Sequence, residues 1–187
     1  MKHILAEAQK ELIAQYAWSE VLLAFDFDGT LAPIVADRDA ALMRTRTRDL
    51  LRALCDLYPC AVISGRSCDD VAPRVLGVPA DRIIGNHGLE SAGDLSPFAE
   101  QIQRVLPCLN AALADVPGLD LEDKGFSLAV HYRRARRKRD ARQIITRAVA
   151  SLPVPLRLVP GKLVFNLIPP NAPHKGDALV KLWDELG

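Results

Sequence analysis

The chain has 187 residues, 49% of them hydrophobic, with 24 basic and 23 acidic side chains and a formal net charge of +1. So balanced a charge gives no general attraction to nucleic acid or to an anionic membrane surface. No apolar run approaches the roughly 18 residues that a membrane-spanning helix needs. The length fits one domain, or a core that carries a modest insertion.

The N-terminus and the cysteines both indicate a cytoplasmic protein. A charged, helix-like stretch over about residues 4–18 lacks the continuous apolar segment of a signal peptide. The four cysteines form no CxxC pair and have no histidine at zinc-finger spacing. We therefore expect buried, reduced thiols at Cys55, Cys60, Cys68 and Cys108.

Strand-like and helical stretches alternate along the first half of the chain. Three apolar runs are typical of buried strands: Val21–Phe25, Cys60–Ser64 and Arg82–Gly88. Helical periodicity follows the first two runs, over about residues 40–57 and 69–76, with Ser67 as the expected cap of the second helix. Such alternation implies right-handed crossovers and a parallel sheet that helices cover on both faces.

The middle of the chain predicts a helix followed by paired strands. The helix is expected over about residues 97–115, and two strands are expected within residues 119–133, broken at Lys124-Gly125. Apolar and polar residues alternate over residues 126–132, which predicts a strand with one wetter face. With a second such pair later in the chain, each preceded by a helix, the pattern is typical of a small α+β unit.

A basic segment separates this pair of strands from a second pair. Arg133–Arg139 holds six basic residues out of seven, and we interpret it as a solvated surface, with attraction of an anion as the alternative. A helix is expected from about Arg137, then two strands that flank a turn at Pro160-Gly161. Residues 169–173 form a proline-rich linker, and a last helix is expected to begin near Gly176.

Two aspartates follow the first expected strand directly. In an open parallel sheet ligands bind beyond the carboxyl ends of the strands, where Asp26, Asp28 and Ser64 are expected to lie. Residues i and i+2 of an extended chain point the same way, so a nucleophilic carboxylate and a second carboxyl could reach one bound group. Gly29 allows close backbone approach, and Thr30 adds a hydroxyl for an anion. A simple turn before a capped helix is the alternative.

Several stretches resemble the motifs of the haloacid-dehalogenase-like phosphatases. The first, second and third motifs of that superfamily are matched by DFDGTLAPI (residues 26–34), VISGR (62–66) and HKGDAL (174–179). More narrowly, GNHGLE (85–90) and LEDKGFSLAVHYR (121–133) are similar to the trehalose-6-phosphate phosphatase branch. The resemblance covers residues 22–186. It implies a phosphatase core with an inserted cap.

The resemblance also implies roles for particular residues. Asp26 would become a phospho-aspartyl intermediate, Asp28 would act as acid and base, and Ser64 would donate to a phosphate oxygen. Lys175 would counter the negative charge, and a lysine at a helix start otherwise opposes the helix dipole. Mg²⁺ is expected on the Asp26 carboxylate and the Asp28 main-chain carbonyl.

Further residues are candidates for binding the phosphate or the sugar. They are Gly29, Thr30, Gly65, Arg66, Asn86, His87, Glu90, Glu122, Lys124, His131, Arg133 and Asn166. For the charged residues of the inserted segment, an ordinary surface position is an equally good interpretation, and His87 between its neighbouring glycines could be a loop residue.

Two features depart from the family pattern. Asn166 occupies a position in the last cap strand where the trehalose phosphatases carry glutamate, which leaves the sugar open. The acidic Gly-Asp-Asp type loop that forms the fourth motif has no counterpart among the 187 residues. We therefore expect the chain to be part of a longer natural protein or to need a partner chain. In the given chain, we expect weak Mg²⁺ binding and an open sheet edge beside the first strand.

Together these observations predict an α/β protein with a haloacid-dehalogenase-like, Rossmannoid parallel-sheet core over residues 1–92 and 171–187, and an inserted α+β cap over residues 93–170. The predicted function is Mg²⁺-dependent hydrolysis of a sugar phosphate through an aspartyl phosphate, with trehalose 6-phosphate as the first candidate. A phosphatase of another phosphorylated sugar or glycoside, and a non-catalytic sugar-phosphate-binding protein, are the alternatives. We expect no nucleic-acid or membrane partner, and the oligomeric state stays open.

Overall fold

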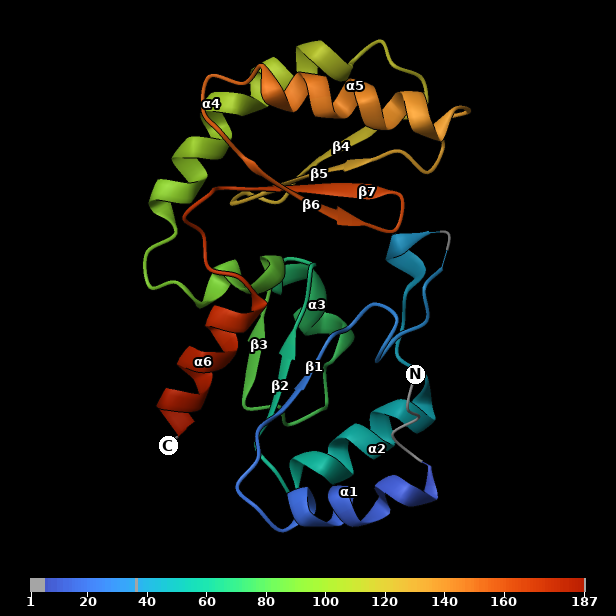
Figure 1. Cartoon of the computed structure of the whole chain (residues 1–187), viewed down its shortest axis with the longest axis vertical. Helices are drawn as coiled ribbons and strands as arrows, with labels where there is room; N and C mark the ends of the chain where they lie inside the picture. The colour runs from blue at the N-terminus through green and yellow to red at the C-terminus, as the bar shows by residue number, and fades with distance from the viewer. Residues whose placement is uncertain (1–5, 36, 187) are drawn as a thin grey trace.

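The computed structural model describes residues 6–35 and 37–186, and two separate sheets organise them (Figure 1). One sheet has three parallel strands in the order β1-β2-β3, and the other has four antiparallel strands in the order β4-β5-β7-β6. In Figure 1 the antiparallel sheet lies above the parallel one, with α4 and α5 on its outer face. None of the helices in the described ranges combines the length and the apolar character that a membrane span requires.

The parallel sheet that the sequence predicts is confirmed. Its strands are β1 (Leu23–Phe25), β2 (Cys60–Ile63) and β3 (Arg82–Ile84). Around it lie the helical elements η1 (Glu7–Gln9), α1 (Lys10–Ala17), η2 (Arg38–Ala40), α2 (Thr45–Cys55), α3 (Cys68–Arg74), η3 (Asn86–Ser91) and α6 (Lys175–Leu186). Part of the predicted N-terminal helix lies outside the described residues.

The first strand is shorter and more exposed than the sequence predicts. Only Leu23–Phe25 of the apolar run pairs with β2, and Ala24 is exposed. β1 is an edge strand among the described strands, so one of its sides has no neighbouring strand, whereas the central β2 is buried throughout. The open edge expected beside the first strand is thus present in the described part of the chain.

Two other boundaries differ from their predictions. The third strand ends at Ile84 instead of Gly88, because Asn86 and His87 take positive φ values of 48° and 58° and turn the chain into η3. The helix expected from residue 40 begins at Thr45, since Asp37 caps the short η2 by accepting a hydrogen bond from the Asp39 amide. The predicted Ser67 cap of α3 is confirmed: its hydroxyl accepts a hydrogen bond from the Asp70 amide.

The antiparallel sheet has one face packed on two helices. Its strands are β4 (Asp120–Asp123), β5 (Leu128–His131), β6 (Arg157–Gly161) and β7 (Val164–Ile168), and the helices are α4 (Ser96–Leu113) and α5 (Lys138–Ala150). The core between them includes Ile102, Leu109, Leu128, Ile145 and Leu167, all fully buried. These residues recur at the spacing of an inward helix face or of alternate strand positions.

The predicted wetter face of β5 is present only in part: His131 is half-buried, but the centre of the strand is closed. Leu128, Ala129 and Val130 are all fully buried. Ala129 pairs with Glu122 on β4 and Asn166 on β7, and the longer side chains of these neighbours enclose its methyl group. The second face of the sheet therefore carries polar groups on β4, β5 and β7, around a closed centre at Ala129.

The turn between β6 and β7 lies two residues later in the chain than the sequence predicts. Pro160 and Gly161 belong to β6, and the reversal occurs at Lys162-Leu163, with Leu163 at φ 62°. Proline cannot donate a ladder hydrogen bond, but it is tolerated here because β6 is an edge strand.

The prediction of buried thiols is correct only in part. Cys60 is buried, and burial raises the pKa of its thiol to about 12, so it stays neutral. Cys55 and Cys68 are half-buried, and Cys108 is exposed, because it lies on the outward side of α4 next to the inward-facing Leu109. All four thiols are free, as expected.

Two glycines with the same backbone conformation test how tightly the antiparallel sheet is packed. Gly118 has φ +83°, and a Cβ there would lie 2.4 Å from the Ala135 amide nitrogen, whereas Gly77 has φ +84° and open space around it. Both alanine variants should lose about 1–2 kcal/mol of unfolding free energy through left-handed strain. Gly118→Ala should lose about 1–3 kcal/mol more because of the clash. Urea denaturation measures both, and equal losses would contradict the packing described here.

Candidate active site

A cavity of about 820 Å³ lies between the two sheets. From the parallel sheet and its loops it is lined by Asp26, Asp28, Gly65, Arg66, His87 and Lys175. From the antiparallel sheet it is lined by Glu122, Lys124, His131, Arg133 and Asn166. The structure therefore brings eleven of the sixteen predicted site residues to one hollow, which we call the inter-sheet cavity.

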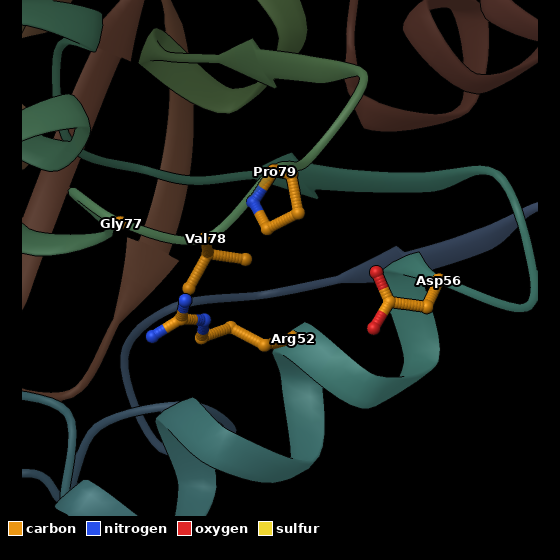
Figure 2. A pocket seen from close by; sticks show the side chains of 5 residues that line it. All are labelled: Arg52, Asp56, Gly77, Val78 and Pro79. Atoms are coloured by element: carbon orange, nitrogen blue, oxygen red, sulfur yellow. The ribbon is translucent and has the colours of Figure 1, made fainter.

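A second, smaller hollow lies elsewhere, between α2 and the turn before β3 (Figure 2). Its volume is about 360 Å³, and Arg52, Asp56, Gly77, Val78 and Pro79 line it. In Figure 2 the Arg52 side chain extends towards Val78, and the Asp56 carboxylate points to the same side, towards Pro79. None of the predicted site residues contributes to this hollow.

Asp26 and Lys175 form an ion pair at the wall of the inter-sheet cavity. Asp26 follows β1, and Lys175 is the first residue of α6. The Lys175 Nζ lies 2.7 Å from the Asp26 Oδ1, and the two side chains are 37% and 45% exposed. Because both groups are partly open to the cavity, a ligand could contact either of them. This contact also explains why a lysine begins the helix.

Asp28 is held by a fork of hydrogen bonds from Arg66. The Arg66 Nε donates to the Asp28 Oδ2 at 2.8 Å, and a terminal guanidinium nitrogen donates to Oδ1 at 2.9 Å. A second terminal nitrogen of Arg66 donates to Asp70 at 2.7 Å. Burial by itself lowers the pKa of Arg66, but the hydrogen bonds to Asp28 and Asp70 outweigh burial and raise it.

Ser64 and Gly65 follow β2 but have different surroundings. Ser64 is fully buried, and its Oγ accepts a hydrogen bond from the Arg66 amide at 3.1 Å. Gly65 lines the inter-sheet cavity, and its carbonyl accepts a hydrogen bond from the Lys124 Nζ at 2.8 Å. A Cβ on Gly65 would lie 2.6 Å from the His87 ring, so any larger residue here would have to displace that ring.

His87 reaches the cavity in a left-handed conformation, with φ 58° and ψ 27°. Burial, and then the positive charges of Lys124 and Lys175, lower the pKa of His87 to about 4, against the weaker effects of Asn166 and Asp26. The imidazole is therefore neutral at physiological pH. Its buried Nε2 has no hydrogen-bond partner within the described residues, so it can contact a polar group of a ligand.

Asn86 and Glu90 lie behind the cavity wall and connect its parts. The Asn86 Nδ2 donates to the Glu90 Oε1 at 2.6 Å, and its Oδ1 accepts from the Ser127 hydroxyl at 2.7 Å, beside β5. Glu90 also accepts from the Cys68 amide at 2.7 Å, and burial raises the pKa of its carboxyl despite these bonds. Both side chains are engaged within the protein, away from the groups that line the cavity.

Glu122 is the centre of a charged cluster on the antiparallel sheet. Its Oε2 lies 2.8 Å from the His131 Nε2 and is in contact with the Arg38 guanidinium, which comes from η2 beside the parallel sheet. Burial alone raises the pKa of Glu122, but the His131 hydrogen bond and the charges of Lys124 and Arg38 outweigh it and lower the pKa. An ionised carboxylate thus bridges the two sides of the cavity.

The remaining predicted residues divide between the two sheets. Lys124 and Arg133 also cross the cavity, the first through its bond to Gly65 and the second through a 2.7 Å bond to the Val35 carbonyl. Asn166 is nearly buried on β7 and lines the cavity. Gly29 (φ +90°) and Thr30 shape the turn after Asp28 and are exposed, outside the groups that line the cavity.

The oxygen donors fit a Mg²⁺ ion that shares its shell with a ligand. Asp26 offers a partly exposed carboxylate, and Asp28 adds a main-chain carbonyl two residues on. No cluster of three or more His, Cys, Asp or Glu side chains in the described ranges is arranged to hold a metal by itself. Mg²⁺ commonly binds one or two carboxylates together with substrate phosphates, which is compatible with this donor set.

The sequence analysis did not identify Arg38 and Asp70, which also line the cavity. Asp70 could have been found from its spacing, because it lies four residues before Arg74 on α3 and pairs with it at 2.7 Å. Arg38 carried no local signal, since its partner Glu122 is far away in the chain.

The neutral His87 predicts a pH dependence of stability. Its pKa is about 4 in the folded chain against 6.5 for the free side chain, so between these values the unfolded chain binds a proton that the folded chain does not. The free energy of unfolding should therefore fall as the pH drops from 6.5 to 4, by as much as about 3 kcal/mol from this group. His87→Asn, which tolerates positive φ, should flatten this slope in urea denaturation at pH 4–7. An unchanged slope would show that His87 is not the group responsible.

Comparison with known proteins identifies the family of this chain. The sequence model of the family described as trehalose-phosphatase matches residues 24–187. A trehalose-phosphate phosphatase from Mycobacterium tuberculosis is 36% identical over 171 residues, covering 87% of this chain and 44% of the relative. A probable trehalose-phosphate phosphatase from Oryza sativa subsp. japonica is 31% identical over 190 residues, covering 95% of this chain and 52% of the relative. The chain thus spans about half the length of these relatives.

The solved structure of the C-terminal domain of the C. albicans trehalose-6-phosphate phosphatase resembles this chain with a TM-score of 0.76 at 23% identity. The match covers 92% of this chain and 64% of the solved C. albicans chain. That likeness confirms the predicted α/β fold with its parallel-sheet core. The match over residues 24–187, together with the fold, shows that this chain belongs to the trehalose-phosphatase family of haloacid-dehalogenase-like proteins.

Proposed function

We propose that this chain carries the phosphatase site of an enzyme that hydrolyses trehalose 6-phosphate to trehalose and phosphate. The observation that supports this proposal most directly is the arrangement at the end of β1. There a partly exposed carboxylate, Asp26, faces Lys175, while a second carboxyl, Asp28, is held beside it at the same cavity. A nucleophile, a proton donor and a cation are the groups that transfer of a phosphoryl group requires.

In the proposed reaction the Asp26 carboxylate attacks phosphorus in line with the ester oxygen. A bond from Asp26 to phosphorus forms, the bond to the sugar oxygen breaks, and Asp28 gives its proton to that oxygen. Asp28 then takes a proton from water as the water attacks the aspartyl phosphate, which releases phosphate and restores Asp26. Lys175 and the backbone near Gly65 would stabilise the charge on the phosphoryl oxygens, whereas the buried Ser64 lies outside the groups that line the cavity.

Asp26 and the Asp28 carbonyl would hold Mg²⁺. When bound, the ion supplies positive charge that offsets the phosphate and polarises its oxygens. This role rests on the donor set and on family membership.

The sugar would bind against the antiparallel sheet. We propose that residues 93–170 act as a cap inserted into a core formed by residues 1–92 and 171–187. Glu122, Lys124 and Asn166 line the sugar side of the cavity with acceptors and donors suited to hydroxyl groups, and His131 and Arg133 lie beside them. The neutral Nε2 of His87 would contact the substrate where the two sides meet.

The nucleophile can be tested by substitution and by trapping. Asp26→Asn should abolish turnover of 4-nitrophenyl phosphate and trehalose 6-phosphate while leaving the fold intact, because the attacking oxygen is lost. Asp28→Asn should still accept a phosphoryl group from the aryl ester, whose leaving group needs no proton. Intact-mass spectrometry after acid quench should detect this adduct in Asp28→Asn and not in the Asp26→Asn/Asp28→Asn double variant. Near wild-type turnover by Asp26→Asn would exclude the aspartyl-phosphate route.

The sugar side can be tested at Glu122. Glu122→Gln should raise the KM for trehalose 6-phosphate by about 10- to 100-fold, the loss expected for a hydrogen bond to a charged group. Its kcat/KM for 4-nitrophenyl phosphate should change less than about threefold, because this small substrate lacks the sugar. The matched control is Asp123→Asn, next on β4 and exposed, where asparagine can still accept from the Gly125 amide. Equal effects on both substrates would contradict a sugar-binding role.

A further inference from the structure

Arg66 has almost no capacity left for a ligand. Its guanidinium makes four hydrogen bonds, to the two Asp28 oxygens, to Asp70 and to the Arg38 carbonyl, at 2.7–2.9 Å. A guanidinium has five N–H donors, so these contacts use four of them. The residue is 8% exposed, and its guanidinium lies over the Phe27 ring at 5.6 Å. Arg66 is thus fixed within the protein, unlike Lys175, which is partly open to the cavity.

A second carboxylate holds Arg66 from the opposite side. Asp70, in the first turn of α3, accepts from Arg66 at 2.7 Å through Oδ2 and from the Arg74 Nε at 3.0 Å through Oδ1. Arg74 in turn donates to the carbonyls of Asp39 and Ala41 at 2.9 and 3.1 Å. The four side chains form one alternating row of charges, Asp28–Arg66–Asp70–Arg74, that links the end of β1 to α3, to η2 and to the residue after η2.

The geometry of the row suits orientation. A bidentate fork fixes both the direction and the plane of a carboxylate, which a single ammonium group cannot do. Each Asp28 oxygen keeps a further lone-pair direction for a ligand. A nearly buried guanidinium is stable only while its partners stay in place, so displacing Asp28 would leave two of its N–H groups unpaired and only Asp70 to balance its charge.

We propose that Arg66 is a positioning residue that acts through Asp28, aiming its carboxyl at the sugar oxygen, and that it does not bind the substrate phosphate. Asp70 and Arg74 hold Arg66 in this arrangement. The proposal rests on the proposed function, in which Asp28 is the acid and base. It replaces the role that the sequence resemblance suggested for Arg66, that of a substrate-binding group.

A double-mutant cycle tests the proposal. Arg66→Met should lower kcat for trehalose 6-phosphate about 100-fold, the scale of a misplaced catalytic group, while KM changes less than about threefold. In the Asp28→Asn background the same substitution should change kcat less than about threefold, because its effect passes through Asp28. Arg66→Lys, which keeps the charge and loses the fork, should recover no more than about a tenth of the wild-type kcat.

Transient kinetics with 4-nitrophenyl phosphate separates the two steps. Because nitrophenolate leaves without a proton, Arg66→Met and Asp28→Asn should both release one equivalent per chain in a fast burst and then turn over slowly. If Arg66 binds phosphate instead, the burst itself should slow, KM should rise about 100-fold, and the losses should add in the double variant. Any of these three results would overturn the proposal.

Controls separate folding and function. Arg48→Met removes another half-buried arginine, which donates to the carbonyls of Leu76 and Arg74, and should keep wild-type kinetics. If Arg66→Met does not fold, as judged by circular dichroism, the kcat and KM of Arg66→Lys decide between the two roles. Wild-type rates in Asp28→Asn would reject the proposed function, whereas an impaired Asp28→Asn beside an unimpaired Arg66→Met would reject only the role of Arg66.

Discussion

Two carboxylates at the end of one strand impose the main constraint on this structure. Asp26 and Asp28 are two residues apart, and like charges this close repel each other unless cations balance them. Each has its own cation from a different element: Lys175 at the start of α6 and Arg66 before α3. The two carboxylates are similarly exposed, but Lys175 is partly open to the cavity and Arg66 is nearly buried. This difference suits Lys175 to meet a ligand and Arg66 to hold its partner in place.

The charge on Asp26 also ties the two ends of the described chain together. The chain leaves the parallel sheet after η3, builds the antiparallel sheet, and returns at α6 to place Lys175 on Asp26. At that return the backbone passes very close to η3: a Cβ on Gly88 would lie 2.5 Å from the carbonyl of His174. Ala178 then packs on Ile63 and Ile84 of the parallel sheet. The contact that neutralises Asp26 therefore fixes where the antiparallel sheet begins and ends, and so places the wall that faces the reacting groups.

Patterns within a few residues predicted much of this arrangement. The apolar run before Asp26, the Ser67 cap and the parallel pairing of β1, β2 and β3 follow from burial, local hydrogen bonding and the alternation of strands with helices, and the structure has all of them. The errors occur where a neighbour distant in sequence decides the outcome. β1 is half-exposed because it is an edge strand. Pro160 is tolerated inside β6 because β6 is also an edge strand. No local pattern states which strand will lie at an edge.

The sequence by itself determined which groups could react and where the strands deliver them, because carboxylates two apart after an apolar strand share one side of an extended chain. Tertiary structure alone decided which cation meets which carboxylate. Arg66 belongs to a stretch that resembles a phosphate-binding motif, yet its fork closes on Asp28 and Asp70. Arg38 has no local signal and meets Glu122 across the cavity. Ion pairs depend on the distances between side chains, and only the packed chain sets those distances.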